Sequence, residues 1–423
     1  MNTFLDPLLD PLFKGYPANA PALRRSQIGE QGWNVLANQL PLPLAVVHRD
    51  ALTHNLSWMQ RLVAEAGIAL APHGKTTMSP QLFQAQMAAG AWGITFATVQ
   101  QLVIGVASGV RRAVIANQVV QTVELAALAA LQRQTPDLRV AFLVDSAEQL
   151  ARIEQADQSI AFEVLVELGL PGGRTGVRTD EEALALARRL HASPCVRLVG
   201  VEAYEGLWAK GEDTEDAVLV NGLMQRLHRF VAACDAEKLF DAGEIIVSAG
   251  GSAVFDLVAR GLRSNPSPRP IQALLRSGCY VTHDDGAYQR YAQAVNRRLG
   301  CSDASGLRAA LEVWTVVQSC PEPGLAILNA GKRDVSTDWG LPVPTKIARA
   351  GERRATAAPA GWTIDKLNDQ HTYLRLNDTE VGLQVGDRVA LGISHPCTTF
   401  DKWRWMAVVD EDYRVVDALT THF

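Results

Sequence analysis

The chain lacks the features typical of secreted, membrane-embedded and nucleic-acid-binding proteins. Its six cysteines are scattered over 423 residues without paired spacing, which argues against a disulfide framework and favours reduced thiols. No stretch reaches the roughly 18 apolar residues of a membrane span. The N-terminus has acids and prolines where a signal peptide needs a continuous apolar run. The net charge of −5 leaves no basic patch for phosphate backbones. We therefore expect a cytoplasmic protein that binds neither membrane nor nucleic acid.

The first two thirds of the chain alternate short apolar runs with longer helical patterns. This alternation is typical of parallel βα units. A (β/α)8 barrel takes eight strands, whereas the sequence offers nine candidates, so one is wrong or lies outside; a doubly wound open sheet would show the same alternation. The candidates are residues 44–47, 68–71, 93–96, 113–115, 140–144, 162–166, 198–201, 245–248 and 273–275, with amphipathic stretches such as 50–66, 180–191 and 216–234 between them.

The pattern changes near residue 298. Short strand candidates at 309–318, 324–329, 372–376, 388–393 and 406–409 are separated by Gly, Pro, Asn and Asp turns, and residues 348–359 are expected to form an exposed loop. We predict three parts: an N-terminal segment at 1–39 that packs on the β domain, an α/β barrel of the TIM type at 40–297, and a mostly β domain at 298–423.

Lys75 stands where an apolar run ends and a helix begins. Ser79 is expected to be the N-cap and Pro80 the first helical residue. Lys75 then lies on the loop at the C-terminal end of a strand, which is the catalytic rim of an α/β barrel. His73 shares a face with Lys75 if the extended geometry persists. The lysine at this position can form an imine; the alternative is a solvated lysine beside a satisfied histidine.

Two later loops also carry candidate binding residues. Gly250, Gly251 and Ser252 end a strand and open a helical run at 253–260, so their N–H groups and the helix dipole suit a phosphate. A Gly-Gly-Ser turn alone is usually just a turn. Arg174 follows the strand at 162–166. Arg174 is a candidate for binding a ligand at the end of this strand. The alternative is that it forms a surface ion pair with one of Asp180, Glu181 or Glu182.

The β domain contains one pair of residues that suits a metal. His395 and Cys397 are two apart on a segment predicted to be extended, so both side chains would point the same way. An imidazole with a thiolate suits zinc, and two ligands leave positions open for water and substrate, as in a catalytic site. The alternative is two partly buried side chains without a metal.

Together these segments resemble the fold-type III pyridoxal-phosphate enzymes, in the branch of D-threonine aldolases, D-serine dehydratases and related amino-acid deaminases. The matching segments are residues 42–55, 72–75 and 88–98. The family often continues K-T-H-K, whereas Lys75 here is followed by Thr-Thr-Met. The resemblance implies pyridoxal phosphate on Lys75 and a divalent metal, zinc in the first place, at His395 and Cys397. It also implies cofactor contacts from His73, Arg174, Tyr204, Gly250, Gly251, Ser252 and Tyr280, the last in the family's R-x-G-x-Y segment.

The same resemblance implies a reaction. Lys75 would serve as the base at Cα and the metal would bind the β-hydroxyl, giving a lyase that converts a D-β-hydroxy amino acid, D-serine in the first place, to a keto acid and ammonia. An arginine directed at the pyridine nitrogen keeps that nitrogen unprotonated and limits charge delocalisation into the ring. D-serine dehydratases resemble this chain in having Cys where aldolases usually have Asp.

Two alternatives remain open at the level of sequence. A retro-aldol lyase would use the same cofactor and metal but release glycine and an aldehyde, and a non-catalytic pyridoxal-phosphate-binding protein would resemble the barrel alone. The resemblance further implies a homodimer whose sites lie between the barrel of one chain and the β domain of another. His371 resembles a family residue that lines the same cleft.

Overall fold

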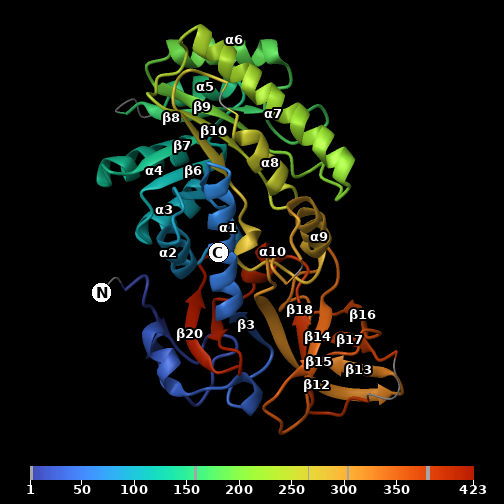
Figure 1. Cartoon of the computed structure of the whole chain (residues 1–423). Coiled ribbons are helices and arrows are strands. Elements are labelled where there is room, and N and C mark those ends of the chain that lie inside the picture. The colour runs from blue at the N-terminus through green and yellow to red at the C-terminus, as the bar shows by residue number, and fades with distance from the viewer. Residues whose placement is uncertain (1–2, 157–159, 265, 303, 378–381) are drawn as a thin grey trace.

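Two large sheets organise the computed structural model, which describes residues 3–156, 160–264, 266–302, 304–377 and 382–423 (Figure 1). The first is an eight-stranded parallel sheet in the order β4-β11-β10-β9-β8-β7-β6-β5. Backbone bonds from Trp92 to Leu70 (2.8 Å) and from Thr95 to Pro72 (2.9 Å) join its two end strands into a barrel. The strands are β4 (Ala69–Leu70), β5 (Ile94–Phe96), β6 (Arg112–Gln118), β7 (Arg139–Val144), β8 (Phe162–Leu168), β9 (Val196–Ala203), β10 (Ile245–Ala249) and β11 (Ile271–Leu275).

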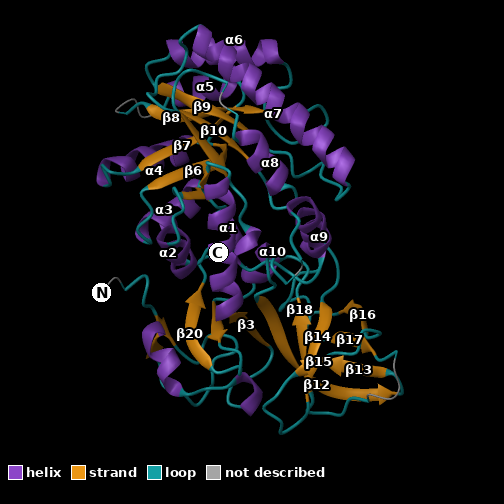
Figure 2. Cartoon of the chain, viewed as in Figure 1, coloured by secondary structure: helices purple, strands orange, loops and turns teal. Residues whose placement is uncertain are grey.

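The barrel strands alternate in the direction of their side chains, which gives two cores. Small and branched residues such as Val114, Leu165 and Ile246 fill the interior, while their neighbours belong to the larger core outside the sheet. Helices surround the strands of this part of the chain (Figure 2). Eight of the nine predicted strands belong to this sheet, and the barrel class is confirmed. The helices of this part are α1 (Arg49–Glu65), α2 (Pro80–Ala88), α3 (Val99–Ala107), α4 (Thr122–Gln134), α5 (Ala147–Glu154), α6 (Asp180–Ala192), α7 (Asp213–Ala236), α8 (Phe255–Leu262) and α9 (Ala287–Leu299).

The ninth candidate strand lies in the other sheet. β3 (Leu44–His48) pairs antiparallel with β12 and parallel with β19, so its apolar run completes the C-terminal sheet instead of the barrel. That sheet also contains strands that the sequence patterns did not indicate, among them β14, β16 and β20. Its remaining elements are β12 (Leu311–Glu322), β13 (Leu325–Leu328), β14 (Val343–Ala348), β15 (Thr356–Ala357), β16 (Thr363–Leu367), β17 (Thr372–Arg375), β18 (Arg388–Gly392), α10 (Pro396–Phe400), β19 (Trp405–Val409) and β20 (Val415–Thr420).

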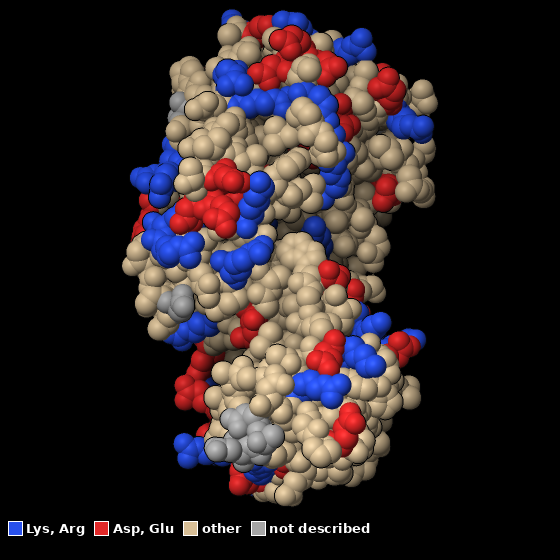
Figure 3. All heavy atoms as spheres, turned by 90° about the vertical axis from the view of Figure 1, so that its right-hand side faces the viewer, with Lys and Arg blue, Asp and Glu red and all other residues tan. Residues whose placement is uncertain are grey.

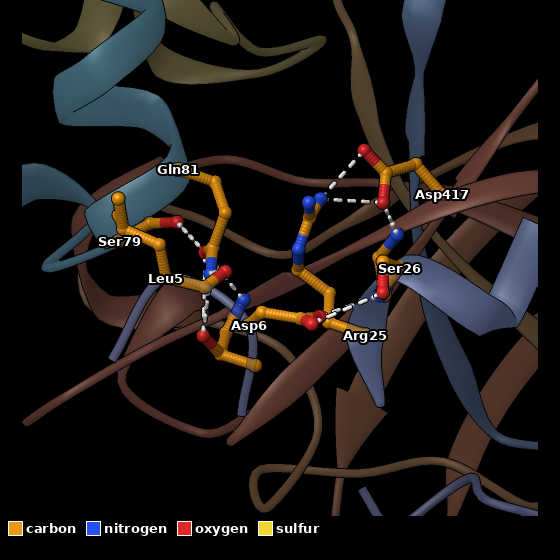
Figure 4. Close-up of polar contacts among 9 residues, drawn as sticks. Leu5, Asp6, Arg25, Ser26, Ser79, Gln81 and Asp417 are labelled. Carbon is orange, nitrogen blue, oxygen red and sulfur yellow. Dashed lines mark hydrogen bonds and ion pairs between the residues drawn. The ribbon is translucent and has the colours of Figure 1, made fainter. Parts of the chain in front are cut away.

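The N-terminal segment packs against both β20 and the start of α2. It contains β1 (Leu8–Leu9), β2 (Leu23–Arg24) and short 3-10 turns. The Arg25 guanidinium lies 2.6 Å from the Asp417 carboxylate, and Gln81 at the start of α2 donates to Leu5 O and accepts from the Thr420 N–H (Figure 4). The contacts of Gln81 join both ends of the chain to the first turn of α2. The division of the chain into parts at residues 40 and 298 stays a prediction.

Basic and acidic side chains lie intermixed on the face of the molecule that Figure 3 displays. Across the part of the chain that the structure describes, none of the helices combines the length and the apolar character that a bilayer span requires.

Candidate active site

A cavity of about 350 Å³ lies at the C-terminal ends of the barrel strands and extends to the β domain. This volume is at the small end of the roughly 300–1,000 Å³ of ligand pockets. The cavity brings together nine of the predicted residues, namely His73, Lys75, Arg174, Tyr204, Gly250, Gly251, Ser252, His395 and Cys397. Residues of the barrel and the β domain of one chain thus line the same space. The contribution of a second chain to the cavity stays a prediction.

Lys75 lies on a 3-10 turn, Gly74–Thr76, between β4 and α2. A Cβ on Gly74 would lie 2.8 Å from Ile94 and 2.9 Å from Phe83, so glycine lets this turn pack directly on the barrel. Ser79 and Pro80 start α2 as the sequence predicts. The Lys75 side chain is exposed in the cavity, and no hydrogen bond or ion pair within the described ranges engages its amine. The amine is therefore available for a cofactor.

His73 lines the cavity beside Lys75 although the extended geometry ends at the 3-10 turn. Burial, reinforced by the cations of Lys75, Arg276 and Arg174, holds the pKa of His73 well below its ordinary value. The ring is therefore neutral at neutral pH. Its Nδ1 is buried and has no hydrogen-bond partner in the described part of the chain. A neutral ring with a free polar atom is a suitable neighbour for an aromatic cofactor.

The predicted phosphate turn has a competitor that the sequence did not reveal. Glu205 is fully buried, and its Oε1 accepts the Gly251 N–H at 2.7 Å. Burial raises the pKa of Glu205, while the N–H groups of this turn act in the opposite direction. The Gly251 N–H is therefore already engaged, contrary to the expectation of a free donor. The Ser252 side chain lines the cavity and its hydroxyl lies beside the Cys279 N–H, while α8 begins only at Phe255.

A buried ion pair lies on the cavity wall near this turn. Arg276 donates to the Glu202 carboxylate and to Ala203 O, and both side chains are almost completely buried. Burial raises the pKa of Glu202 to about 8 against the effect of Arg276, and Glu167 adds to the rise. Arg276 is the first residue of the R-x-G-x-Y segment that ends at Tyr280. The sequence pattern gave no sign of its partner Glu202, which lies 74 positions away.

Arg174 and Tyr204 occupy one side of the cavity together. The Arg174 guanidinium lies 5.1 Å from the centre of the Tyr204 ring, within the range of a cation–π contact. Within the described residues, Arg174 forms none of the surface ion pairs that the sequence left open, and Asp180 instead pairs with Arg226 and Arg229. The position of Arg174 in the cavity is compatible with the predicted contact to a cofactor ring.

The β domain supplies the other end of the cavity. His395 is the N-cap of α10, whereas Cys397 lies inside that helix, so the predicted extended segment is wrong. Pro396 at the first helical position and the Thr399 hydroxyl, which donates to His395 O at 3.0 Å, favour the helical turn. Both side chains nevertheless line the cavity.

The His395 ring is held by residues that sequence reasoning missed. Its Nδ1 lies 2.7 Å from Asp338 Oδ2, and the ring stacks on Trp339 with centroids 4.7 Å apart. Burial acts to raise the pKa of Asp338, but the bonds from His395 and Thr398 lower it. This arrangement leaves Nε2 as the free ring nitrogen. A carboxylate on one ring nitrogen is the usual support of a histidine that binds a metal through the other.

A second thiol lies beside Cys397. The sulfurs of Cys279 and Cys397 are 3.6 Å apart, and the Thr76 hydroxyl lies 3.5 Å from Cys397. The thiol of Cys397 stabilises the thiolate of Cys279, which lowers the pKa of Cys279. The same bond, together with burial, keeps the proton on Cys397 and raises the pKa of Cys397. An imidazole and two thiols are donors that suit a divalent ion such as zinc. In the described ranges, no three His, Cys, Asp or Glu side chains already converge as a metal site.

Two predicted residues lie outside this cavity. Tyr280 is buried behind it, where its hydroxyl accepts a bond from Gln86 at 3.3 Å. The reason is the 3-10 turn Cys279–Val281, which faces Cys279 toward the cavity and Tyr280 away from it. His371 is exposed in the turn between β16 and β17 and does not line the cavity.

Comparison with known proteins agrees with the fold and the two-part site. A family model described as the alanine racemase N-terminal domain matches residues 47–261, just over half of the chain, and one described as a putative serine dehydratase domain matches residues 310–409. Lys75 thus falls in the first matched domain, and His395 and Cys397 fall in the second. The chain belongs to the fold-type III pyridoxal-phosphate enzymes, in the D-serine dehydratase and D-threonine aldolase-like family, as the resemblance implied.

Individual relatives extend over nearly the whole chain. A D-threonine aldolase from Arthrobacter sp is 29% identical over 376 residues, covering 87% of this chain and 88% of the relative. A D-threo-3-hydroxyaspartate dehydratase from Delftia sp. (strain HT23) is 29% identical over 376 residues, covering 85% and 92%. The crystal structure of D-threonine aldolase from Filomicrobium marinum superposes with a TM-score of 0.78 at 22% identity, covering 92% of this chain and 97% of that one, which shows the shared fold.

Proposed function

We propose that this protein is a pyridoxal-phosphate- and metal-dependent lyase that dehydrates a D-β-hydroxy amino acid, D-serine in the first place, to give pyruvate and ammonia. The observation that carries the proposal is the single cavity that contains both Lys75 and the pair His395 and Cys397. An amine suited to the cofactor and donors suited to a divalent ion therefore face the same bound molecule. The relatives named for D-threonine and D-threo-3-hydroxyaspartate support a substrate with a β-hydroxyl.

The roles of the chain's residues follow from their positions. When bound, pyridoxal phosphate would withdraw electrons from the substrate Cα and a divalent ion would polarise the β-hydroxyl. Lys75 would hold the cofactor, yield its place to the substrate amine, and then accept the Cα proton. His73 would pack beside the ring without adding charge. Arg174 would face the pyridine nitrogen and keep it unprotonated.

The phosphate end of the cofactor is proposed to lie at Gly250, Gly251 and Ser252. Because Glu205 already accepts the Gly251 N–H, the Ser252 hydroxyl is the stronger candidate donor of the three. Tyr204 would pack against the cofactor on the side of Arg174. Tyr280 would act only through the packing of its turn, since its hydroxyl points to Gln86.

Dehydration is preferred to aldol cleavage because position 397 is a cysteine. In the family that this chain resembles, D-serine dehydratases have Cys where aldolases usually have Asp. A retro-aldol lyase stays the second candidate, because an aldolase is among the relatives at 29% identity. It would use the same residues but remove the proton of the β-hydroxyl. A variant of a D-threo-3-hydroxyaspartate dehydratase has been solved in a metal-free form, which supports a metal in this branch.

We also propose a cytoplasmic homodimer. All six cysteines are free in the structure, which is compatible with a reducing compartment. Trp339 and Leu207 at the cavity wall are 50% and 54% exposed, and large apolar side chains at such positions favour burial against a second chain. Sedimentation of the purified protein measures the assembly directly, and a monomer at micromolar concentration would refute it.

The test of the function is an analysis of the products from a panel of D- and L-serine, D- and L-threonine and the 3-hydroxyaspartates. Pyruvate and ammonia from D-serine are the expected products. Glycine with an aldehyde would establish the aldolase instead. If no member of the panel is consumed by protein loaded with cofactor and zinc, the enzymatic proposal fails and the non-catalytic alternative takes its place.

A further inference from the structure

Cys279 reaches the same end of the cavity as the proposed metal pair, although it comes from the barrel and not from the β domain. Its sulfur lies 3.6 Å from that of Cys397. Two thiolates that bind one tetrahedral ion at about 2.3 Å are separated by about 3.8 Å. The observed separation therefore matches the edge of a metal tetrahedron to within a few tenths of an ångström.

Both sulfurs are held in place by other elements. Cys279 follows Gly278, where a Cβ would lie 2.6 Å from His73 O, so the turn is pressed onto the Lys75 loop. The Cys279 N–H donates to Ser252 Oγ at 3.4 Å. The Thr76 hydroxyl lies 3.5 Å from the Cys397 sulfur and 3.9 Å from that of Cys279. Thr76 is thus placed to donate to a thiolate on either side.

We propose that Cys279 is a third protein ligand of the metal, so that the site is Cys2His with one position open for the substrate. This inference rests on the proposed function, which expects the ion at His395 and Cys397. Catalytic zinc sites typically have three protein ligands and one open position, and Cys2His is one of the known sets. The third ligand thereby completes a site that two residues alone leave half formed.

The imidazole has to approach the sulfurs when the ion binds, because no three such ligands converge among the residues that the structure describes. Asp338 holds Nδ1 and leaves Nε2 as the donor to the ion. Two thiolates balance the charge of a divalent cation and favour zinc over the harder magnesium and manganese. Because Cys279 belongs to the barrel and Cys397 to the β domain, the bound ion would also link these two parts of the chain.

The test measures the metal itself in protein that keeps its cofactor. Cobalt is added to four metal-free proteins: wild type, Cys279→Ser, Cys279→Ala and the control Cys301→Ser. The thiolate-to-cobalt absorbance is measured as the difference between the cobalt and zinc forms, because this difference removes the absorbance of the cofactor. We expect the absorbance per bound cobalt to fall to about half in both Cys279 variants, because one of two sulfur ligands is lost, and to stay unchanged in the control. A wild-type band of unchanged intensity in a folded Cys279 variant would overturn the inference.

A second measurement needs no variant. Wild type is treated with a thiol-alkylating reagent with and without zinc, and the labelled peptides are identified by mass spectrometry. Zinc should protect Cys279 and Cys397 together while Cys320, which is exposed, is labelled in both samples. Protection of Cys397 alone refutes a role for Cys279 but leaves the proposed function intact. Protection of neither, with no thiolate band from cobalt, removes the metal from the proposed function as well.

Discussion

The Glu312 carboxylate on β12 joins β3 to the rest of the β domain, and Glu312→Gln measures the strength of this contact. Its Oε1 lies 2.8 Å from both His48 Nε2 and Trp314 Nε1, and its Oε2 accepts from Lys346 Nζ at 2.7 Å. Burial acts to raise the pKa of Glu312, but the interactions with His48 and Lys346 outweigh it and lower the pKa from 4.5 to about 2.

This shift sets the magnitude of the effect. A change of one in a pKa corresponds to about 1.4 kcal/mol, so the lowered pKa of Glu312 corresponds to about 3 kcal/mol of folding free energy. Because the pKa is lower in the folded state than in the unfolded state, the contribution is complete above the unfolded value of 4.5 and is lost as the pH falls through about 2. We expect Glu312→Gln to lower the free energy of unfolding by about 3 kcal/mol at neutral pH. The difference from wild type should shrink as the pH is lowered below 4.5.

The assay is urea denaturation followed by tryptophan fluorescence, at neutral pH and at two acidic values. The control is Glu237→Gln, which removes an exposed ion pair with Arg188 on the barrel surface and should change stability little at any pH. A Glu312→Gln difference that is the same at neutral and acidic pH would refute the reasoning, since the loss would then come from packing and not from the charge.

Three further predictions concern the site. Borohydride should fix the cofactor on the peptide that contains Lys75, whose amine is free in the cavity, and labelling of a different lysine would refute its role. A chelator should abolish ammonia release from D-serine while the visible absorbance of the cofactor persists, because Lys75 and not the metal pair is expected to hold the cofactor. Unfolding on chelation would indicate a structural ion instead. Asp338→Asn should weaken zinc binding about 10-fold and Asp338→Ala about 100-fold, because asparagine keeps an acceptor for His395 Nδ1 whereas alanine leaves none. Competition with a coloured chelator measures this, and equal affinities in all three proteins would show that Asp338 does not orient the ring.

The barrel could be predicted because its strands are buried on both faces and therefore form continuous apolar runs. The same property explains the error at β3. An apolar run indicates burial but not the partner strand, and Leu44–His48 pairs with β12 more than 260 residues later in the chain. Strands such as β16, Thr363–Leu367, were missed because polar residues on its exposed face break the apolar run.

The candidate site was predictable where one loop contains the whole signal. Lys75 stands beside a strand end and a helix start, and both are visible in the sequence. Asp338 and Glu205 were missed because their significance depends on partners from other segments, His395 for the first and Gly251 for the second. Cys279 was visible in the sequence, but its meaning depends on a sulfur 118 positions away.

The position of Lys75 depends on both ends of the chain as well as on its own loop. Gln81 at the start of α2 is bonded to Leu5 and Thr420, and the His422 N–H donates to Met78 O at 3.0 Å in the segment that leads from Lys75 to α2. Met78 has a φ of 41°, a left-handed conformation that non-glycine residues adopt only when surrounding contacts hold them. The terminal residues supply such contacts. The loop that contains Lys75 is thus fixed on one side by the barrel, through Gly74, and on the other side by the two chain ends.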